Sequence, residues 1–273
     1  MLAVVSDIHG NLPALQAVVA DATARGATAF LDLGDTVSGP LWPEETAAWI
    51  AARGWPGIAG NHERQVLTQP LARQSATDRI TSQKLSAASR AWLASRPPTL
   101  RPAPGLWAVH GTPGSDLHYL LETVVPGHRP GHPFGQDAGL REASDDELRE
   151  RLGAVPADVT LLLCGHSHLP RHRRLLFGER GLQIVNPGSV GLPAYDDDHP
   201  LPHDVENGDP RARYALLVPP ASAGAPWDVT LCAVPYDAEA AARQAEAHGR
   251  GDWADALRTG RVGRRERDVT RAD

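Results

Sequence analysis

The sequence predicts an α/β fold in which a largely parallel sheet carries helices on its outside. Strand-like apolar runs alternate with segments of helical period in the first sixty residues. The runs at 2–5 and 159–164 are apolar throughout, as in strands buried on both faces. Polar clusters follow five of the apolar runs, and clusters at strand ends can meet at one edge of a sheet.

The first βα unit has clear boundaries. Residues 2–5 form the expected strand, and the helix is expected from about Leu12 to Arg25. Asn11 is placed to cap this helix, and Gly26 ends it. Its expected apolar stripe consists of Leu12, Leu15, Val18, Val19 and Ala22.

The next elements continue the alternation. A second strand over 29–33 is broken by Gly34-Asp35, a second helix covers 43–53, and a third strand covers 56–59. The following stretch is helical from near Arg64 to Ser95. Its expected core contacts are Leu85, Ala88, Trp92 and Leu93.

The second half is richer in short strands. Leu100 and 106–109 read as two of them, and a helix over 145–152 has Ser144 as its cap. Residues 126–139 are rich in Pro, Gly and His and are expected to be an insertion loop. A continuous apolar strand is expected at 159–164, and later strands, often antiparallel, are expected at 173–177, 182–185, 214–218 and 229–234.

The remaining segments complete a single expected domain over 1–260. Residues 195–210 are acidic and are expected to form an exposed loop. A helix is expected over 238–248, and 261–273 read as a charged, frayed tail.

Composition narrows the classes of function. No stretch approaches the roughly 18 apolar residues of a membrane span, and no basic region precedes the first strand, so it is not a signal peptide. Cys164 and Cys232 lie in apolar runs, which argues against a structural disulfide and makes the cytoplasm the default location. A net charge of -6 argues against broad nucleic-acid binding.

The polar clusters carry metal-ligand chemistry. In Asp7-x-His9 and His166-x-His168 the two side chains would share one side of an extended backbone. Asp35 and Asn61 follow glycines, which leaves room for an approaching ion. Carboxylate, amide and imidazole ligands together suit Mn, Fe, Co, Ni or Zn.

Each cluster alone also has an ordinary structural explanation, such as a helix cap or a turn. His110-Gly111 is almost uninformative by itself. The ordered set, with each member at a strand end, instead predicts a site for two metal ions.

The set resembles the calcineurin-like metallophosphoesterase superfamily, from Met1 to about Gly191. The loop Asn186-Pro187-Gly188-Ser189-Val190-Gly191, together with Gly39-Pro40 and Tyr236-Asp237, resembles its small prokaryotic phosphodiesterase branch. The segments 126–139 and 195–210 depart from that pattern. The resemblance implies a four-layer α-β-β-α sandwich, with two mixed sheets face to face and helices on both outer sides.

The resemblance also implies the ligand set and the reaction, a dinuclear-metal-dependent phosphoester hydrolysis. One metal would be held by Asp7, His9, Asp35 and His168, and the second by Asp35, Asn61, His110 and His166, with Asp35 bridging. Manganese is the expected metal, and a metal-bridging hydroxide would make the in-line attack. The two divalent ions would carry four positive charges, and Asp7, Asp35 and the hydroxide would neutralise three of them. The centre would therefore remain positive and attract a phosphate.

Roles for the remaining polar residues follow from this scheme. His62 would protonate the leaving oxygen. Glu63 would either orient that imidazole or hold it charged, or else act as a helix-start carboxylate. Ser167 is expected to point away from the metals, Ser189 and Gly188 to form a turn rather than the site floor, and Arg64 to be solvated.

The expected substrate is a small phosphoester, nucleotide-like or a phosphodiester. A protein phosphatase with the same mechanism and a non-catalytic scaffold of the same fold are the alternatives. The complete ligand set argues against the scaffold. The run Asp196-Asp197-Asp198 argues against a nuclease on long DNA if it lies near the cleft.

Overall fold

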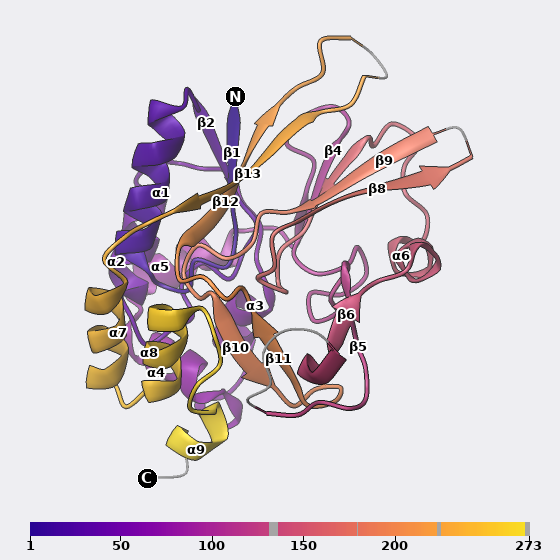
Figure 1. Ribbon diagram of the computed structural model, residues 1–273. Helices are drawn as coiled ribbons and strands as arrows, with labels where there is room; N and C mark the ends of the chain where they lie inside the picture. The colour runs from indigo at the N-terminus through magenta and orange to yellow at the C-terminus, as the bar shows by residue number, and fades with distance from the viewer. Residues whose placement is uncertain (131–135, 179, 223–224, 271–273) are drawn as a thin grey trace.

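Two mixed β-sheets face each other in the computed structural model, which describes residues 1–130, 136–178, 180–222 and 225–270 (Figure 1). The first sheet contains β1 (Leu2–Val5), β2 (Ala29–Asp32), β12 (Ala212–Val218) and β13 (Asp228–Val234), in the order β13-β12-β1-β2. The second contains β3 (Thr99–Leu100), β4 (Leu106–Val109), β7 (Leu161–Leu163), β8 (Arg171–Phe177) and β9 (Arg180–Asn186), in the order β3-β4-β7-β9-β8.

Both sheets combine parallel and antiparallel pairs of strands. β1 pairs with β2 in parallel, and β7 pairs in parallel with both β4 and β9. β12, β13, β3 and β8 pair antiparallel with their neighbours. Two hairpins, β5 (Glu122–Val124) with β6 (Leu140–Glu142) and β10 (Ala194–Asp197) with β11 (His203–Glu206), form separate two-stranded sheets.

Helices complete the outer layers. The α-helices are α1 (Leu12–Ala24), α2 (Pro43–Ala51), α3 (Asn61–Thr68), α4 (Ala76–Lys84), α5 (Ala87–Ala94), α6 (Asp145–Leu152), α7 (Ala238–Ala247), α8 (Gly251–Thr259) and α9 (Glu266–Thr270). Two short 3-10 helices are η1 (Leu71–Arg73) and η2 (Gln136–Ala138). As the sequence indicates, the Asn11 and Ser144 side chains accept the N-terminal amide hydrogens of α1 and α6.

Strand alternation sends side chains to opposite faces of each sheet, which builds the four layers. Val4 of β1 packs between the sheets with Leu106 and Leu161 of the second sheet. Its neighbours Ala3 and Val5 face the other way, into the cluster that contains the buried side chains of α1. On the far side, the second sheet packs against α6. Full burial of each large apolar side chain contributes about 1.5–3 kcal/mol. The predicted α-β-β-α sandwich is therefore confirmed.

The expected third strand at 56–59 is wrong. A single parallel bridge joins Asp32 to Gly57, and the backbone then leaves the first sheet. Pro56 has no amide hydrogen to donate, and the Ala59 amide hydrogen goes to the carbonyl of Pro97 (2.8 Å) instead. This departure directs the next residues, from Asn61 onward, into a helix.

The helical stretch after this point also differs in detail from the prediction. It contains α3, η1, α4 and α5, and α3 begins at Asn61 rather than near Arg64. Leu85 and Leu93 are buried as expected and Trp92 is half-buried, but Ala88 is exposed because it lies on the outer face of α5.

The acidic segment 195–210 is not an exposed loop. Its first part forms the β10–β11 hairpin, and Asp204 is buried. The Arg265 guanidinium lies 2.9 Å from the Asp204 carboxylate and 3.4 Å from that of Asp196. The positive charge of Arg265, from the C-terminal segment, thus compensates these carboxylates and allows the acidic hairpin to be partly buried.

The C-terminal segment is likewise not a frayed tail over its described residues, which end at 270. It contains α9, and Arg265 is buried against the hairpin. Helix α8, which precedes this segment and which the sequence did not lead us to expect, packs beside α7. Of the 126–139 segment, residues 131–135 lie outside the described residues, and His128 contacts Asp204 (3.0 Å).

Arg265 is expected to stabilise the hairpin measurably. Replacing Arg265 by Met leaves Asp196 and Asp204 without their shared counter-charge, which should lower the free energy of unfolding by about 3 kcal/mol. Urea unfolding followed by fluorescence and circular dichroism measures the change. The matched variant Arg211→Met removes an exposed arginine paired with Asp209 and should cost no more than about 0.5 kcal/mol. Equal losses of unfolding free energy in the two variants would show that Arg265 does not stabilise the hairpin more than an exposed arginine does.

Cys164 and Cys232 are buried and free, as expected. Over the described ranges, no helix combines the length and apolar character that crossing a bilayer requires.

Candidate metal centre

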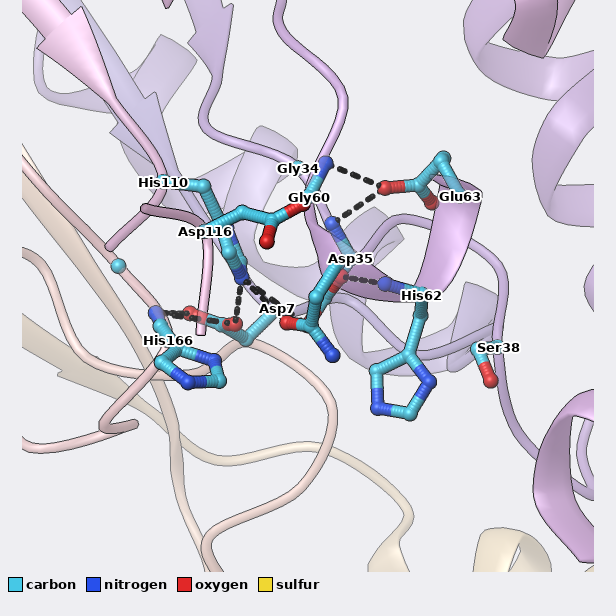
Figure 2. Close-up of polar contacts among 12 residues, drawn as sticks. Asp7, Gly34, Asp35, Ser38, Gly60, His62, Glu63, His110, Asp116 and His166 are labelled. Atoms are coloured by element: carbon cyan, nitrogen blue, oxygen red, sulfur yellow. Dashed lines mark hydrogen bonds and ion pairs between the residues drawn. The ribbon is translucent and has the colours of Figure 1, made fainter. Parts of the chain in front are cut away.

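The polar clusters meet where the two sheets approach each other. Asp7 follows β1, Asp35 follows β2, and the Asp7 amide donates to the Gly34 carbonyl (3.0 Å). His110 follows β4, and its carbonyl accepts from Gly165 (2.7 Å), which follows β7. The His166 amide then reaches the Asp7 carboxylate (3.1 Å), which links the two sheets (Figure 2).

Asp7, His9 and His168 form one group of potential metal ligands. One ligand atom from each lies within 4.8 Å of the others, and all three residues are buried. The Nε2 atoms of His9 and His168 are 3.1 Å apart, and Nε2 of His168 is 3.5 Å from Asp7 Oδ1.

Asp35, His110 and His166 form the second group, under the same 4.8 Å limit. His110 Nε2 is 3.1 Å from Asp35 Oδ2 and 3.1 Å from the amide oxygen of Asn61. His110 Nε2 also lies 4.0 Å from Asp7 Oδ1, so the two groups adjoin. All seven residues predicted as ligands thus come together.

The backbone fixes which ring nitrogen faces the centre. Nδ1 of His9, His110 and His168 is hydrogen-bonded to the carbonyls of Ser38 (2.6 Å), Leu33 (2.8 Å) and Leu192 (2.7 Å), respectively. A carbonyl only accepts, so each Nδ1 carries the hydrogen and each neutral ring turns its Nε2 lone pair to the centre. In the neutral state, the lone pairs of His9 and His168 therefore face each other. A cation between them replaces that repulsion with coordination, and the residues fit a divalent metal.

The ligand-bearing backbone is left-handed, not extended as the spacing argument assumes. Asp7, His9, Asp35, His166 and His168 have φ of 53°, 52°, 51°, 68° and 56°. Each such conformation costs a non-glycine residue about 1–2 kcal/mol. Side chains two residues apart therefore converge through tight turns that the surrounding hydrogen bonds hold in place.

Glycine at position 60 serves the packing of loops rather than the entry of an ion. A Cβ on Gly60 would collide with the Asp35 carboxylate and the Asp35 backbone nitrogen. The absent side chain lets the Asp35 and Asn61 loops touch, which places Asp35 beside α3. The room expected at Gly60 for an approaching ion is thus taken up by the Asp35 loop.

Burial and neighbouring charge set the protonation states. Burial, reinforced by His168, lowers the pKa of His9 to about 3. Burial, reinforced by His110, lowers the pKa of His166 to about 4. Burial acts to raise the pKa of Asp35, but the charges of His110, His62 and His9 hold it well below its usual value. Burial acts to lower the pKa of His110, but Asp35 and Asp7 outweigh it and raise that pKa to about 10. Asp35 is thus ionised and His9 and His166 are neutral, the forms that bind metals, whereas His110 must release a proton to bind one.

His62 lies beside the two groups without belonging to either. Its amide donates to Asp35 Oδ1 (2.9 Å), and its Nδ1 is 2.7 Å from Asp78 Oδ1 on α4. Burial opposes the charged ring, but Asp78 and Asp35 outweigh it and raise the pKa of His62 to about 10. The ring is 24% exposed, so it can reach a substrate.

Asp78 is the residue that orients His62, and the sequence reading missed it. The Ser38 hydroxyl donates to the same carboxylate (2.6 Å), which fixes its position. Nothing in the local pattern of α4 marks Asp78, because it sits in an ordinary first helical turn after the Ser75 cap.

Glu63 does not orient the His62 ring, because its carboxylate is hydrogen-bonded elsewhere, but its charge is one of the smaller contributions that raise the pKa of His62. Its carboxylate accepts from the amides of Asp35, Thr36 and Gly60, each at 2.8 Å. The alternative of a helix-start carboxylate agrees with this capping box. Because Glu63 also holds the Asp35 turn, it positions a ligand indirectly.

The other residues discussed from the sequence have structural partners. Arg64 is not simply solvated, because it makes two hydrogen bonds to Asp116 (2.6 and 2.8 Å). Ser167 is buried and accepts from Asn186 (3.1 Å). The Ser189 hydroxyl donates to the Asp7 carbonyl (2.8 Å), so the turn at Gly188 supports the first ligand loop.

Aromatic residues that the sequence reading missed cover the centre. Tyr195 of β10 packs its ring 4.6 Å from that of His168 and donates to the His166 carbonyl (3.1 Å). Its hydroxyl meets that of Tyr119 (2.7 Å). Trp253 of α8 packs 5.7 Å from His9. Segments distant in sequence thus close the site.

Asp78→Asn tests whether this carboxylate positions His62. We expect kcat to fall by about 10- to 100-fold with unchanged metal content, because a displaced acid transfers its proton less efficiently. Asp78 raises the pKa of His62, so its loss should lower that pKa. The decline of kcat at alkaline pH should then begin at a lower pH. Steady-state kinetics across pH measures this, with Asp146→Asn, an exposed change on α6, as control. An unchanged dependence of kcat on pH in Asp78→Asn would show that Asp78 does not position His62.

Comparison with known proteins agrees with this geometry. The sequence model of the family described as calcineurin-like phosphoesterase matches residues 1–170. An uncharacterized protein of Methanocaldococcus jannaschii is 42% identical over 217 residues, covering 71% of this chain and 77% of that protein. A metallophosphoesterase from Sphaerobacter thermophilus has a TM-score of 0.67 at 23% identity, covering 95% of this chain and 98% of that one. A hypothetical protein from Pyrococcus horikoshii OT3 has a TM-score of 0.68 at 18% identity, covering 97% and 100%. The two structures share the fold.

Proposed function

Since the chain belongs to the calcineurin-like phosphoesterase family, we propose that it is a dinuclear metal-dependent hydrolase of small phosphoesters, phosphodiesters included. The observation that carries this proposal is the adjacency of two ligand groups, Asp7-His9-His168 and Asp35-His110-His166. A structural site for a single ion would not need the second group.

Each ligand has a role in this proposal. Asp7, His9, Asp35 and His168 would hold one ion, and Asp35, Asn61, His110 and His166 would hold the other. Asp35 would be shared: one of its oxygens lies 3.1 Å from His110 Nε2, and the other accepts from the His62 amide. Manganese is the metal we expect, because the mixed oxygen and nitrogen ligands suit a borderline divalent ion.

The chain's own residues supply the remaining chemistry. Two bound divalent ions would polarise the phosphoryl oxygens and provide a nucleophile at neutral pH. His62, held by Asp78, donates its proton to the leaving oxygen, which is typically worth 10²–10⁴ in rate. Tyr195, Tyr119 and Trp253 restrict access of bulk water to the ligands.

Burial of the centre favours a small substrate over a phosphoprotein. Six of the seven ligands are buried, and only His166 is partly exposed. The cover over His168 comes from the β10–β11 hairpin and its Tyr195. A phosphoester group that projects from a small molecule can enter such a site, whereas a folded phosphoprotein surface would meet the hairpin first. The acidic run Asp196-Asp197-Asp198 adjoins Tyr195 and disfavours a long polyanion.

Metal removal tests the proposed reaction. The full-length protein loaded with Mn²⁺ is expected to hydrolyse bis(para-nitrophenyl) phosphate. Dialysis against a chelator should lower turnover by at least about 10³-fold, since the metals stabilise several kcal/mol of transition-state charge. Restoring Mn²⁺ should restore turnover.

The same preparation distinguishes the alternatives. Faster release of phosphate from phosphopeptides than from nucleotides would favour a protein phosphatase. Stoichiometric metal binding without chelator-sensitive turnover on any mono- or diester would favour a scaffold of the same fold.

A further inference from the structure

Arg64 is a charged side chain beside the second ligand group that the proposed reaction does not use. It lies on α3 three positions after Asn61, and residues three apart share one face of a helix. Its side chain is 42% exposed. Hydrogen bonding to Asp116 and, to a smaller extent, the charge of Asp35 raise the pKa of Arg64 against the opposing effect of burial. The guanidinium is therefore within electrostatic reach of the shared carboxylate.

The loop after β4 brings Asp116 to the same side of the centre. This loop begins at His110, and the ring of His166 is hydrogen-bonded to the backbone of Leu117. Asp116, the neighbour of Leu117, is thus held next to the second ligand group. In Figure 2, Asp116 lies on the same side of Asp35 as His166. His166 is the one partly exposed residue among the predicted ligands, so the centre opens to solvent here.

Asp116 binds one edge of the Arg64 guanidinium and leaves the other edge open. Nε and Nη2 of Arg64 donate to the two carboxylate oxygens of Asp116, at 2.6 and 2.8 Å. Among the described residues, Nη1 and the second hydrogen of Nη2 have no hydrogen-bond partner. The pair Nη1 and Nη2 forms a planar fork that matches two oxygens of a phosphate. Because Asp116 already orients the fork, binding a phosphate costs Arg64 little further side-chain entropy.

The open fork discriminates between two types of phosphoester. A monoester carries three strong acceptor oxygens and a charge of about -1.5 to -2 at neutral pH. A diester has one charged oxygen fewer, because a second organic group occupies it. With the ester oxygen directed to His62, a monoester can still present charged oxygens both to the ligand groups and to Arg64. A diester would place a neutral ester oxygen, which is a weaker acceptor, in one of these positions.

We propose that Arg64, held by Asp116, is a substrate-binding residue that favours phosphomonoesters over phosphodiesters. Its open fork donates to the charged oxygens that a monoester has and a diester lacks. This inference rests on the proposed phosphoester reaction and names the substrate class that the centre favours. Diesters remain substrates, because neither the ligand groups nor His62 depends on Arg64.

Kinetics with para-nitrophenyl phosphate and bis(para-nitrophenyl) phosphate test this discrimination on the full-length chain loaded with Mn²⁺. The two compounds share a leaving group and differ in the second ester. Arg64→Met should lower kcat/KM for the monoester by about 10- to 100-fold, because a pair of charge-assisted hydrogen bonds is lost. For the diester the loss should stay within about threefold. Arg141→Met removes another arginine with two hydrogen bonds to a carboxylate, that of Glu147, and should change either value by less than about twofold.

A binding measurement separates the role of Arg64 from turnover. Calorimetry compares inorganic phosphate with dimethyl phosphate on the Mn²⁺-loaded chain after unbound metal has been removed. Arg64→Met should weaken phosphate binding by about tenfold or more and dimethyl phosphate binding by less than about threefold. If the wild-type chain turned over neither ester but showed this difference, the proposed hydrolase reaction would be wrong and the assignment of Arg64 would stand.

Two outcomes in a folded, metal-replete Arg64→Met chain would overturn the assignment. One is an equal loss of kcat/KM on both esters, and the other is unchanged affinity for inorganic phosphate. If Arg64→Met loses metal, Arg64→Lys replaces it, because lysine keeps a positive charge beside Asp116 but has no planar fork. The ratio of monoester to diester kcat/KM should then fall by about threefold or more. An unchanged ratio in Arg64→Lys would likewise overturn the assignment.

Discussion

Asp35→Asn is expected to abolish turnover and to reduce metal content, and it is the largest effect we predict. Asp35 is buried and lies against both His110 and the His62 amide. Asparagine keeps the shape and removes the charge that both ions would share. Loss of several kcal/mol of charge stabilisation corresponds to a fall in kcat/KM of at least about 10³-fold.

Metal analysis after gel filtration decides whether Asp35 bridges. The wild-type chain should retain about two ions, and the variant should retain less than one, because both sites lose a shared ligand. Asp116→Asn makes the same chemical change at the partly exposed partner of Arg64 and should retain both ions. Full metal content in Asp35→Asn would show that the bridging assignment is wrong.

His62→Ala is expected to reduce kcat by about 10²–10⁴ while metal content stays near normal. His62 lies outside both ligand groups, so its loss removes a proton donor and no ligand. The reduction should be greatest for alkyl phosphodiesters. It should be much smaller for para-nitrophenyl esters, whose leaving phenolate needs little protonation.

The dependence on the leaving group separates this role from general damage to the site. Kinetics with a series of phosphodiesters of differing leaving-group basicity measures it, and His199→Ala, which changes a 93% exposed side chain, serves as control. An equal loss across the series, or a parallel loss of metal, would exclude His62 as the general acid.

The architecture could be predicted because its signals are local. The apolar residues 2–5 and 106–109 give β1 and β4 at the predicted positions. The Ser144 side chain and its partner Glu147 form the capping box that starts α6. Hydrophobic period, caps and turn residues act within a few positions of each other.

The convergence of the candidate ligands could be predicted for a related reason. Apart from Asn61, each lies within a few residues of the end of a strand, and strands that run in parallel bring such positions to one edge. The predicted third strand at 56–59 is wrong because a strand needs a neighbouring strand as hydrogen-bond partner. The Ala59 amide donates to the carbonyl of Pro97 and not to β2. The conformation of the ligand turns also escaped prediction, since the left-handed backbone at Asp7 and His9 depends on bonds from other loops.

By itself, then, the sequence determined most strands and helices of this protein and the candidate metal ligands near the ends of its strands, because periodicity and strand-end position are properties of short segments. The four-layer arrangement was expected only from the resemblance to a known family. Only the tertiary structure decided what surrounds them. It places the Asp78 carboxylate in hydrogen-bonding distance of the His62 ring and packs the Tyr195 ring against that of His168. It also pairs Arg265 with the acidic β10–β11 hairpin and lets the Glu63 carboxylate accept from the Asp35 amide. These pairs join helices, hairpins and loops far apart along the chain or in separate elements. Their attraction depends on distances that folding alone establishes, and no local pattern records them.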